Sequence, residues 1–119
     1  MDHSLNNKVV LIAGGAKNLG GVIARDLAKA GAKAIVVHYN SAATQAAADE
    51  TVAAVKAAGA DAIAVQGDLT IPANVTALFD KAIATFGGID IAINTTGMVI
   101  KKPIVDVTEA DYDVMFAVN

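Results

Sequence analysis

Short apolar runs rich in β-branched residues alternate along this chain with longer segments of helical periodicity. The predicted strands are Lys8–Ala13, Ala34–His38, Ala62–Gln66 and Ile89–Asn94. The predicted helices are Gly21–Ala30, Ser41–Ala58 and Pro72–Phe86, and a last helix is expected to begin at Thr108. Connections of a few residues between such units require parallel pairing through right-handed crossovers. Because strands that are apolar throughout are typical of a sheet covered on both faces, the sequence predicts an α/β fold, a three-layer α/β/α parallel sheet in one domain over residues 1–119.

Composition and charge exclude several functions. The 119 residues carry a net charge of −3 and only 4% aromatic residues, so binding of nucleic acid through charge and stacking is not expected. Cysteine is absent and His3 and His38 are the only histidines, so no metal site is predicted. No apolar run reaches the ~20 residues of a membrane span, and the polar start MDHSLNNK has no signal-peptide core. We therefore expect a cytoplasmic protein without a membrane partner.

The glycine-rich stretch AGGAKNLGG, Ala13–Gly21, lies between the first predicted strand and the first predicted helix. Glycines in such a turn let the backbone approach a phosphate, and the free N–H groups of the helix N-terminus attract its charge. A P-loop of the Walker A type is excluded, because Gly21 and Val22 stand where that loop needs Lys and Ser or Thr. The stretch predicts a phosphate site, and a tight turn without a ligand stays open as the alternative.

The loop resembles the T-G-x-x-x-G-x-G pattern of the short-chain dehydrogenase/reductase family. The match runs from Ala13 to Gly20, with Ala13 in place of Thr and Asn18 in place of Gly. Since Asn tolerates a left-handed backbone better than other non-glycine residues, the turn is expected to survive the second departure. The resemblance implies a Rossmann-type sheet, truncated here to its first half and one further strand. It also implies cofactor contacts from Gly14, Ala16, Lys17, Asn18, Leu19 and Gly20.

A second segment, GDL at Gly67–Leu69, follows the third predicted strand and is similar to the adenine pocket of that family. The resemblance implies that the Asp68 carboxylate accepts a hydrogen bond from the adenine amino group, while the Leu69 backbone contacts the ring edge. Ordinary turn chemistry is the alternative for Asp68.

A third segment, NTTG at Asn94–Gly97, ends the fourth predicted strand and is similar to the N-N-A-G of the family, with Thr95 and Thr96 as departures. It implies further cofactor contacts from Asn94, Thr95 and Gly97, and a simple strand-ending turn is the alternative. All three segments lie beyond the carboxyl ends of their strands, where sheets of this kind bind ligands. The resemblance covers the chain from Lys8 onward.

The end of the second predicted strand favours NADP(H) over NAD. The stretch VVHYNSAA has no carboxylate, whereas a unit that binds NAD normally places Asp or Glu there for the ribose 2′-hydroxyl. Asn40 and Ser41, next to Tyr39, supply donors for a 2′-phosphate instead, and Lys17 occupies the position where NADP-preferring members of the family carry a basic residue. Ser41 as a helix cap and Lys17 as a solvated charge are the alternatives.

The catalytic residues that the resemblance implies are not found in this sequence, apart from one. The family uses a Tyr acid/base whose pKa is lowered by a Lys four residues later, a Ser that orients the carbonyl, and a supporting Asn. Ala43 and Phe116 stand four residues after Tyr39 and Tyr112, so Tyr-x-x-x-Lys does not occur. The segment FAVN resembles the one that carries the supporting Asn, which makes Asn119 the candidate, with a frayed terminal residue as the alternative.

Taken together, these features predict the NADP(H)-binding part of an oxidoreductase that transfers hydride between NADP(H) and a small carbonyl or secondary alcohol. We expect a fragment of a protein of about twice this length, inactive alone, from a parent that is a homo-oligomer. The fourth strand would then expose an apolar edge, and residues 95–107 after it are expected to form the longest irregular loop. A non-catalytic module that holds or senses a dinucleotide is the alternative, and a structural domain without a nucleotide is a third.

Overall fold

A computed structural model describes residues 5–15, 18–95 and 99–100 of the chain. Its strands are β1 (Val9–Ala13), β2 (Ala34–Tyr39), β3 (Asp61–Gln66), β4 (Ile91–Asn94) and β5 (Val99–Ile100). Its helices are α1 (Asn18–Lys29), α2 (Gln45–Ala57) and α3 (Pro72–Phe86), with a 3-10 turn, η1 (Ala42–Thr44), before α2. The helix expected from Thr108 lies outside the described residues.

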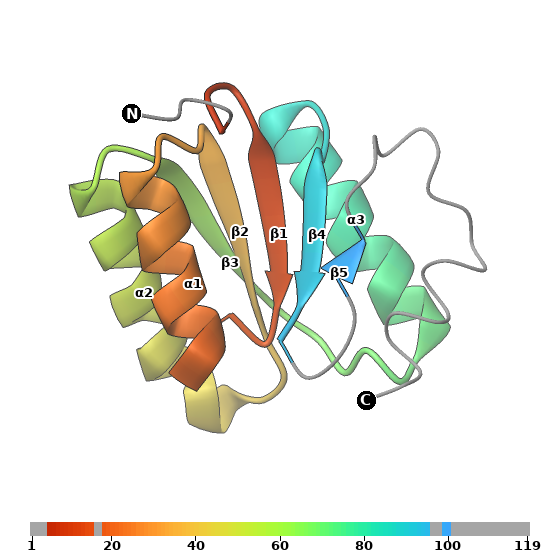
Figure 1. Cartoon of the computed structure of the whole chain (residues 1–119). Coiled ribbons are helices and arrows are strands. Elements are labelled where there is room, and N and C mark those ends of the chain that lie inside the picture. Colours follow the sequence, from red (N-terminus) through yellow and green to blue (C-terminus); the bar gives the residue numbers. More distant parts are fainter. Residues whose placement is uncertain (1–4, 16–17, 96–98, 101–119) are drawn as a thin grey trace.

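The sheet has the order β3-β2-β1-β4-β5, and β1 to β4 are parallel as predicted (Figure 1). β1 pairs with β2 from Val9 opposite Ala34, and with β4 from Val10 opposite Ile91. All strands of this parallel set therefore end at one edge, where the glycine-rich stretch follows β1. The strand order reverses at β1, and the crevice at such a reversal is where open α/β sheets bind ligands.

The short strand β5 corrects two expectations. Residues 99–100 were expected in an irregular loop and the edge of β4 was expected to be open, but β5 pairs antiparallel with β4, Ala92 opposite Ile100 and Ile93 opposite Val99. The β-branched pair Val99–Ile100 thus covers part of the β4 edge, which otherwise presents unpaired backbone groups. A strand of two residues has no periodicity from which it could be predicted.

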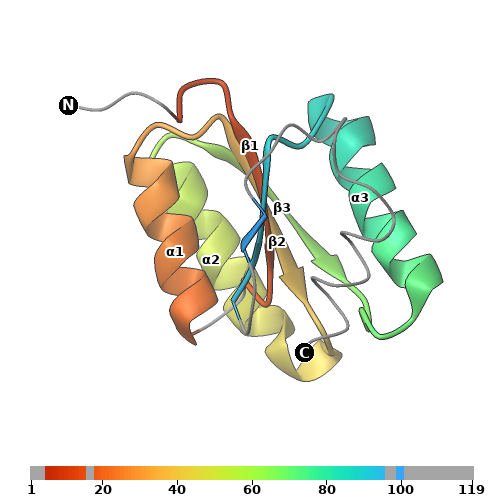
Figure 2. The ribbon, with the colours of Figure 1, turned by 45° about the vertical axis from the view of Figure 1, so that its right-hand side comes forward.

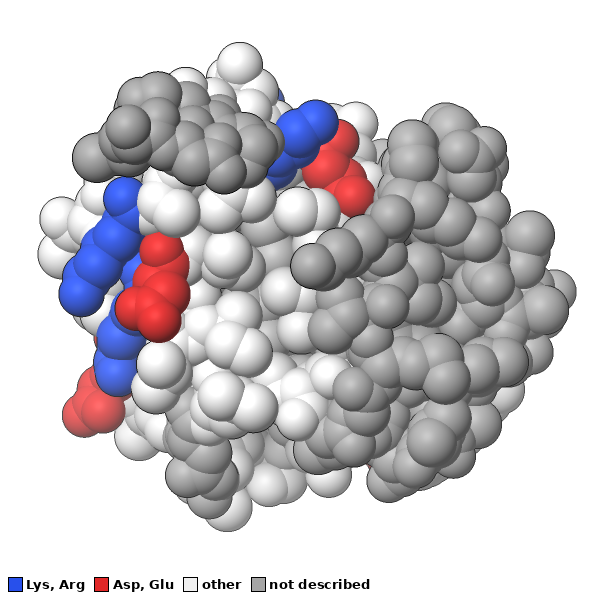
Figure 3. All heavy atoms as spheres, in the orientation of Figure 1, with Lys and Arg blue, Asp and Glu red and all other residues white. Residues whose placement is uncertain are grey.

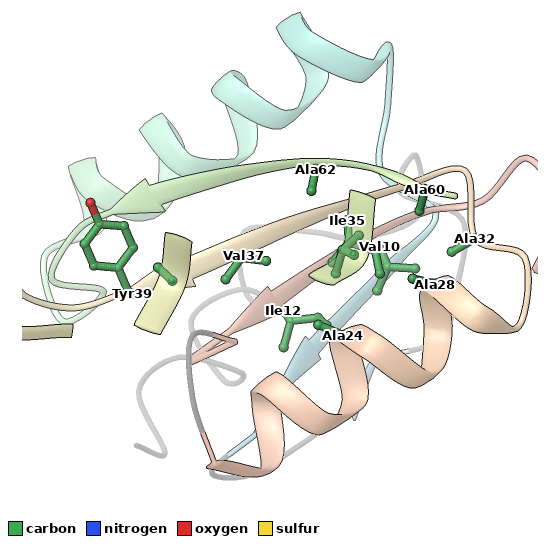
Figure 4. Packing of buried hydrophobic residues seen from close by; sticks show 12 residues of the cluster. Val10, Ile12, Ala24, Ala28, Ala32, Ile35, Val37, Tyr39, Ala60 and Ala62 are labelled. Atoms are coloured by element: carbon green, nitrogen blue, oxygen red, sulfur yellow. The ribbon is translucent and has the colours of Figure 1, made fainter. Parts of the chain in front are cut away.

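Helices cover both faces of the sheet (Figure 2), which confirms the predicted three layers. α1 and α2 lie on one face and α3 on the other. Successive side chains of the buried strands point to opposite faces of the sheet. Ile35 and Val37 pack in the hydrophobic cluster under α1 and α2, and Val36 packs in the cluster under α3. Figure 4 shows Ala24 and Ala28 of α1 directed at the sheet, where their small side chains let the helix approach closely.

The segment after β2 differs from the expected single helix over Ser41–Ala58. The Thr44 amide and the Thr44 hydroxyl both donate to the Ser41 carbonyl, at 3.0 and 2.9 Å, and this tight turn becomes η1. The α-helix itself begins only at Gln45. The side chain of Ser41 makes no capping hydrogen bond, so the alternative of a Ser41 cap is not realised.

Asp90 joins β1 and β4 at the end of the sheet opposite the glycine-rich stretch. The Val9 amide donates to Asp90 Oδ2 at 2.8 Å, and the Asp90 amide donates to the Val9 carbonyl at 2.9 Å. Two reciprocal hydrogen bonds therefore fix the register in which β4 starts beside β1. Within the described part of the chain, no helix is long and apolar enough to cross a bilayer.

Candidate functional site

The glycine-rich stretch turns sharply at the carboxyl end of β1. Gly14 has φ 73°, the left-handed region that L side chains rarely adopt, and a Cβ there would lie 2.8 Å from Thr95 Oγ1. Two independent constraints therefore require glycine at this position. α1 begins at Asn18, and its N-terminal end lies at the same edge of the sheet (Figure 1).

Gly20, in the first turn of α1, lets the helix pack directly on the loop. A Cβ on Gly20 would collide with the Gly14 carbonyl and would lie 2.8 Å from the Gly15 Cα, and both are backbone atoms that cannot move aside cheaply. The helix N-terminus is thus held against the loop with no side chain between them. Its free amides and its dipole can act on an anion that lies there.

Asn18 corrects a detail of the sequence prediction. It was expected to take a left-handed conformation in place of glycine, but it is the first residue of α1 and is helical. Among the described residues, Asn7 is the only non-glycine residue with positive φ. The loop tolerates Asn18 because that position needs no special backbone, and the left-handed turn is made earlier, at Gly14.

His38 is the residue of this edge that sequence reasoning missed. It lies near the end of β2, is 5% exposed, and contacts the loops after both neighbouring strands. The Gly14 amide donates to His38 Nδ1 at 3.0 Å, and His38 Nε2 donates to the Gly67 carbonyl at 2.7 Å. The one available signal was a polar residue at the end of an otherwise apolar strand, next to the strand that carries the glycines.

Both partners of His38 fix its tautomer. An amide can only donate and a carbonyl can only accept, so Nδ1 must be unprotonated and Nε2 must carry the proton. Burial lowers the pKa of His38, because it disfavours the charged ring, and the hydrogen bond to Gly67 opposes this in part. The imidazole is therefore neutral in the folded chain at neutral pH.

Thr95 ties the loop to the end of β4. Its hydroxyl donates to the Ala13 carbonyl at 3.2 Å, and its amide approaches the same oxygen at 3.4 Å. Asn94 lies beside it, 5% exposed and opposite Ala13 in the sheet register. Thr95, which departs from the N-N-A-G pattern, thus has a structural partner in the loop that was predicted to bind the cofactor.

Asp68 forms a turn of its own beyond β3. Its Oδ1 accepts from the Thr70 hydroxyl at 2.7 Å and from the Thr70 amide at 3.0 Å, and these bonds lower the pKa of the exposed carboxyl. Asn74 Nδ2 donates to the Asp68 carbonyl at 3.0 Å and anchors the loop to α3. Leu69 is half-buried and packs on the α3 side of the sheet. Asp68 thus forms the turn that the sequence left open as the alternative, and its carboxylate stays ionised and exposed at the carboxyl edge.

The end of β2 presents two exposed polar residues and one buried ring. Asn40 and Ser41 are exposed. Tyr39 is 9% exposed and belongs to the cluster under α1 and α2 (Figure 4), while its carbonyl accepts from the Gly67 amide at 3.0 Å. Because little of the Tyr39 side chain is accessible to a ligand, its predicted contact with a cofactor would have to come mainly from its backbone.

The structure gathers most of the predicted site at this one edge. The residues that it places there are Gly14, Leu19, Gly20, Asn40, Ser41, Asp68, Asn94 and Thr95. Leu19 is 58% exposed at the start of α1. The predictions for Ala16, Lys17, Gly97 and Asn119 lie outside the described residues, as does the side chain of Asn18.

Two other features bear on what this edge can bind. In Figure 3, the Lys, Arg, Asp and Glu side chains of the described surface lie at the margin of the face, and its centre is uncharged. The described residues contain no group of three or more His, Cys, Asp or Glu that could hold a metal ion.

A hollow of about 370 Å³ lies at the opposite end of the sheet. It is open, and it is far from the glycine-rich stretch in the strand direction. Its lining residues are Asn6, Asn7, Gly31, Ala32, Lys33 and Gly59.

Comparison with known proteins matches residues 8–119 to the short chain dehydrogenase family. A short chain dehydrogenase/reductase of Aspergillus novofumigatus is 40% identical over 115 residues, which cover 97% of this chain and 42% of that protein. Elsinochrome reductase 1 of Elsinoe fawcettii is also 40% identical over 115 residues, with the same coverage.

Solved structures give the same result. A dehydrogenase from Burkholderia cenocepacia with bound NADP is 65% identical, with a TM-score of 0.78 over 98% of this chain and 44% of that one. A blue fluorescent protein from a metagenomic library, in complex with NADPH, is 36% identical, with a TM-score of 0.72 over 92% of this chain and 44% of that one. The chain thus spans less than half the length of these relatives. With the family match extending over nearly all of its residues, the chain belongs to the short-chain dehydrogenase family.

Proposed function

We propose that this chain is the NADP(H)-binding part of a short-chain oxidoreductase. The observation that carries the proposal is the contact between α1 and the glycine-rich stretch at Gly14 and Gly20, where no Cβ fits. Such a bare backbone cradle at a helix N-terminus suits the pyrophosphate of a dinucleotide. It lies at the reversal of strand order, and a relative 65% identical to this chain has NADP bound.

The adenosine half of the cofactor is proposed to lie across the ends of β2 and β3. Asp68 Oδ1 is held by Thr70, so the other oxygen of this exposed carboxylate is the one proposed to accept from the adenine amino group. Asn40 and Ser41 are exposed at the end of β2 and are proposed, with Lys17, to bind the ribose 2′-phosphate. No carboxylate stands at the end of β2 to favour the 2′-hydroxyl of NAD.

Hydride transfer is proposed as the activity of the whole protein. NADP(H), when bound, supplies or accepts the hydride, and the substrate is proposed to be a small carbonyl or secondary alcohol. The name of elsinochrome reductase 1 supports a reductase, and Asn119 is proposed as the supporting Asn. The sequence contains no Tyr-x-x-x-Lys, so the chain by itself is proposed to bind the cofactor without turnover. A homo-oligomer and a cytoplasmic location remain predictions from the sequence.

Calorimetric titration with NADP⁺ and NAD⁺ tests this function. We expect the chain to bind NADP⁺ more tightly than NAD⁺, because charge-assisted hydrogen bonds to the 2′-phosphate contribute about 1.5–3 kcal/mol each. Lys17→Ala should weaken the binding of NADP⁺ by about 10- to 100-fold and leave the affinity for NAD⁺ nearly unchanged. Lys29→Ala, at the other end of α1, is the matched control. Equal affinity of the wild type for the two dinucleotides would contradict the choice of NADP(H).

Oxidation of NADPH with a panel of carbonyl compounds separates the enzyme from a binding module. The whole protein should turn over at least one carbonyl, whereas this chain should bind NADPH and leave it unoxidised. Binding without turnover in the whole protein would favour a module that only holds or senses the cofactor.

A further inference from the structure

The imidazole of His38 connects two loops that the proposed function assigns to two parts of the cofactor, the pyrophosphate and the adenine. Nδ1 accepts from Gly14, at the proposed pyrophosphate site, and Nε2 donates to Gly67, which precedes the proposed adenine acceptor Asp68. These two partners are 24 and 29 residues from His38 in the sequence. The main chain of β2 strengthens the connection, because the His38 carbonyl accepts from the Gly15 amide at 3.0 Å.

We propose that His38 is a positioning residue for the dinucleotide: its neutral imidazole holds the glycine-rich loop and the Gly67–Leu69 loop at the spacing that the cofactor requires, and protonation of the ring weakens binding. The inference rests on the proposed function, since it assigns these loops to the cofactor. His38 itself need not touch the ligand.

The physical basis is the fixed polarity of the two partners. A protonated ring would carry N–H groups on both nitrogens, so Nδ1–H would face the Gly14 N–H, donor against donor. The Gly14 amide would lose its acceptor, and the left-handed turn at Gly14 would lose one of the contacts that hold it. The hydrogen bond from Nε2 to Gly67 would remain, so protonation would release the glycine-rich loop and not the adenine loop.

Few charged or titratable groups surround His38 whose own protonation could be mistaken for that of its ring. Of the segments around this part of β2, the end of β1 contributes Ala13, the loop after β1 contributes Gly14, and β3 contributes Val65 opposite His38; none of these side chains titrates. The residues of α3 that face the sheet are apolar, and its charged Asp80 and Lys81 are exposed. Among the described residues, the charge that comes nearest in sequence to either partner is Asp68, whose Oδ1 is held by Thr70.

Two substitutions test the two hydrogen bonds of the ring separately, because each keeps one bond and removes the other. The side-chain oxygen of His38→Asn can take the place of Nδ1 and accept from Gly14, but it cannot reach Gly67. The side-chain amide of His38→Gln can take the place of Nε2 and donate to Gly67, but it leaves Gly14 without its partner. At about pH 7.5, each variant should bind NADP⁺ about 3- to 10-fold more weakly than the wild type, the effect of one hydrogen bond.

The pH profile distinguishes positioning by a neutral ring from a merely structural role. The 2′-phosphate of NADP⁺ itself titrates near about pH 6, so His38→Asn serves as the baseline for that effect. As the pH falls from about 7.5 through the lowered pKa of His38, the wild type should lose more affinity than the variant, by up to about 10-fold, because only the wild type has an imidazole at position 38 to protonate. Parallel profiles in the two proteins would overturn the proposal.

A readout without cofactor keeps the test separate from the proposed function. In ¹⁵N NMR of the full chain at about pH 7.5, His38 should show an unprotonated Nδ1 and a protonated Nε2. Exchange of the Gly14 amide should accelerate on acidification relative to its exchange in His38→Asn. A charged ring or an Nδ1–H tautomer at that pH would overturn the proposal, even if a variant failed to fold. If neither dinucleotide binds, the proposed function fails, and the Gly14 exchange alone decides whether His38 positions the loop.

Discussion

Position 20 requires glycine because a side chain there has no room beside the loop, so a substitution at Gly20 tests the proposed phosphate cradle directly. A methyl group at Gly20 meets the backbone of Gly14 and Gly15, whereas a methyl group at Gly88 meets nothing within 4 Å. Gly20→Ala should therefore push α1 off the loop and reduce NADP⁺ affinity at least about 10-fold, while Gly88→Ala should leave it unchanged. Titration of both variants checks this, and equal affinities would show that the close approach of α1 is not used for binding.

Thr95 contributes to the same turn from β4. Thr95→Val removes the hydroxyl that donates to the Ala13 carbonyl and keeps the shape of the side chain. It should lower the free energy of unfolding by about 0.5–1.5 kcal/mol. Thr95→Ser keeps the hydroxyl and should lower the free energy of unfolding by less. Urea unfolding measures both, and a larger loss in the Ser variant would contradict a role for the hydroxyl.

Acid should destabilise the chain at two separate pH values. The pKa of His38 is lowered by burial, so the unfolded chain binds this proton more readily, and the free energy of unfolding falls as the pH drops from about 6.5 toward the lowered pKa. The pKa of Asp68 is lowered by the Thr70 hydroxyl and amide, so its contribution is kept above about pH 4 and is lost below. Urea unfolding across this range should show the first decrease in the wild type and not in His38→Asn. A decrease of the same size in the variant would assign it to other groups.

At the scale of elements, Asp90 sets β4 beside β1. Asp90→Ala leaves the Val9 amide without its acceptor and should lower the free energy of unfolding by about 1–3 kcal/mol, whereas Asp90→Asn keeps an oxygen for that amide and should lose less. Hydrogen exchange of the Val9 amide gives a local check. Exchange that stays slow in the Ala variant would mean that pairing with β4 does not depend on this contact.

The sequence predicts the regular elements well, and the exceptions have physical causes. β1 and β2 are buried along their whole length, so continuous apolar runs were sufficient to place them. η1 was missed because it depends on the particular bonds of Thr44 to Ser41, and β5 because two residues have no period. The polar His38 in an otherwise apolar strand was the only local sign of its role, because its two partners come together only in the folded sheet.

At the scale of the whole molecule, the dinucleotide is proposed to lie across the carboxyl edge of the sheet. The glycine-rich loop, the Asp68 turn and the end of β4 meet there, and the hollow at Asn6, Asn7 and Gly59 lies at the other end. The two ends are separated by the length of the strands, so a bound ligand should affect only one of them. This separation makes the location of binding measurable without knowledge of the substrate.

The most direct measurement is the change in amide NMR signals of the full chain on titration with NADP⁺. If the dinucleotide binds at the carboxyl edge, the signals of Gly14, Gly20 and Asp68 should shift and saturate together, while those of Asn7 and Gly59 at the opposite end stay in place. Shifts centred on the opposite end, or no shift at the carboxyl edge at saturating NADP⁺, would contradict binding at this edge.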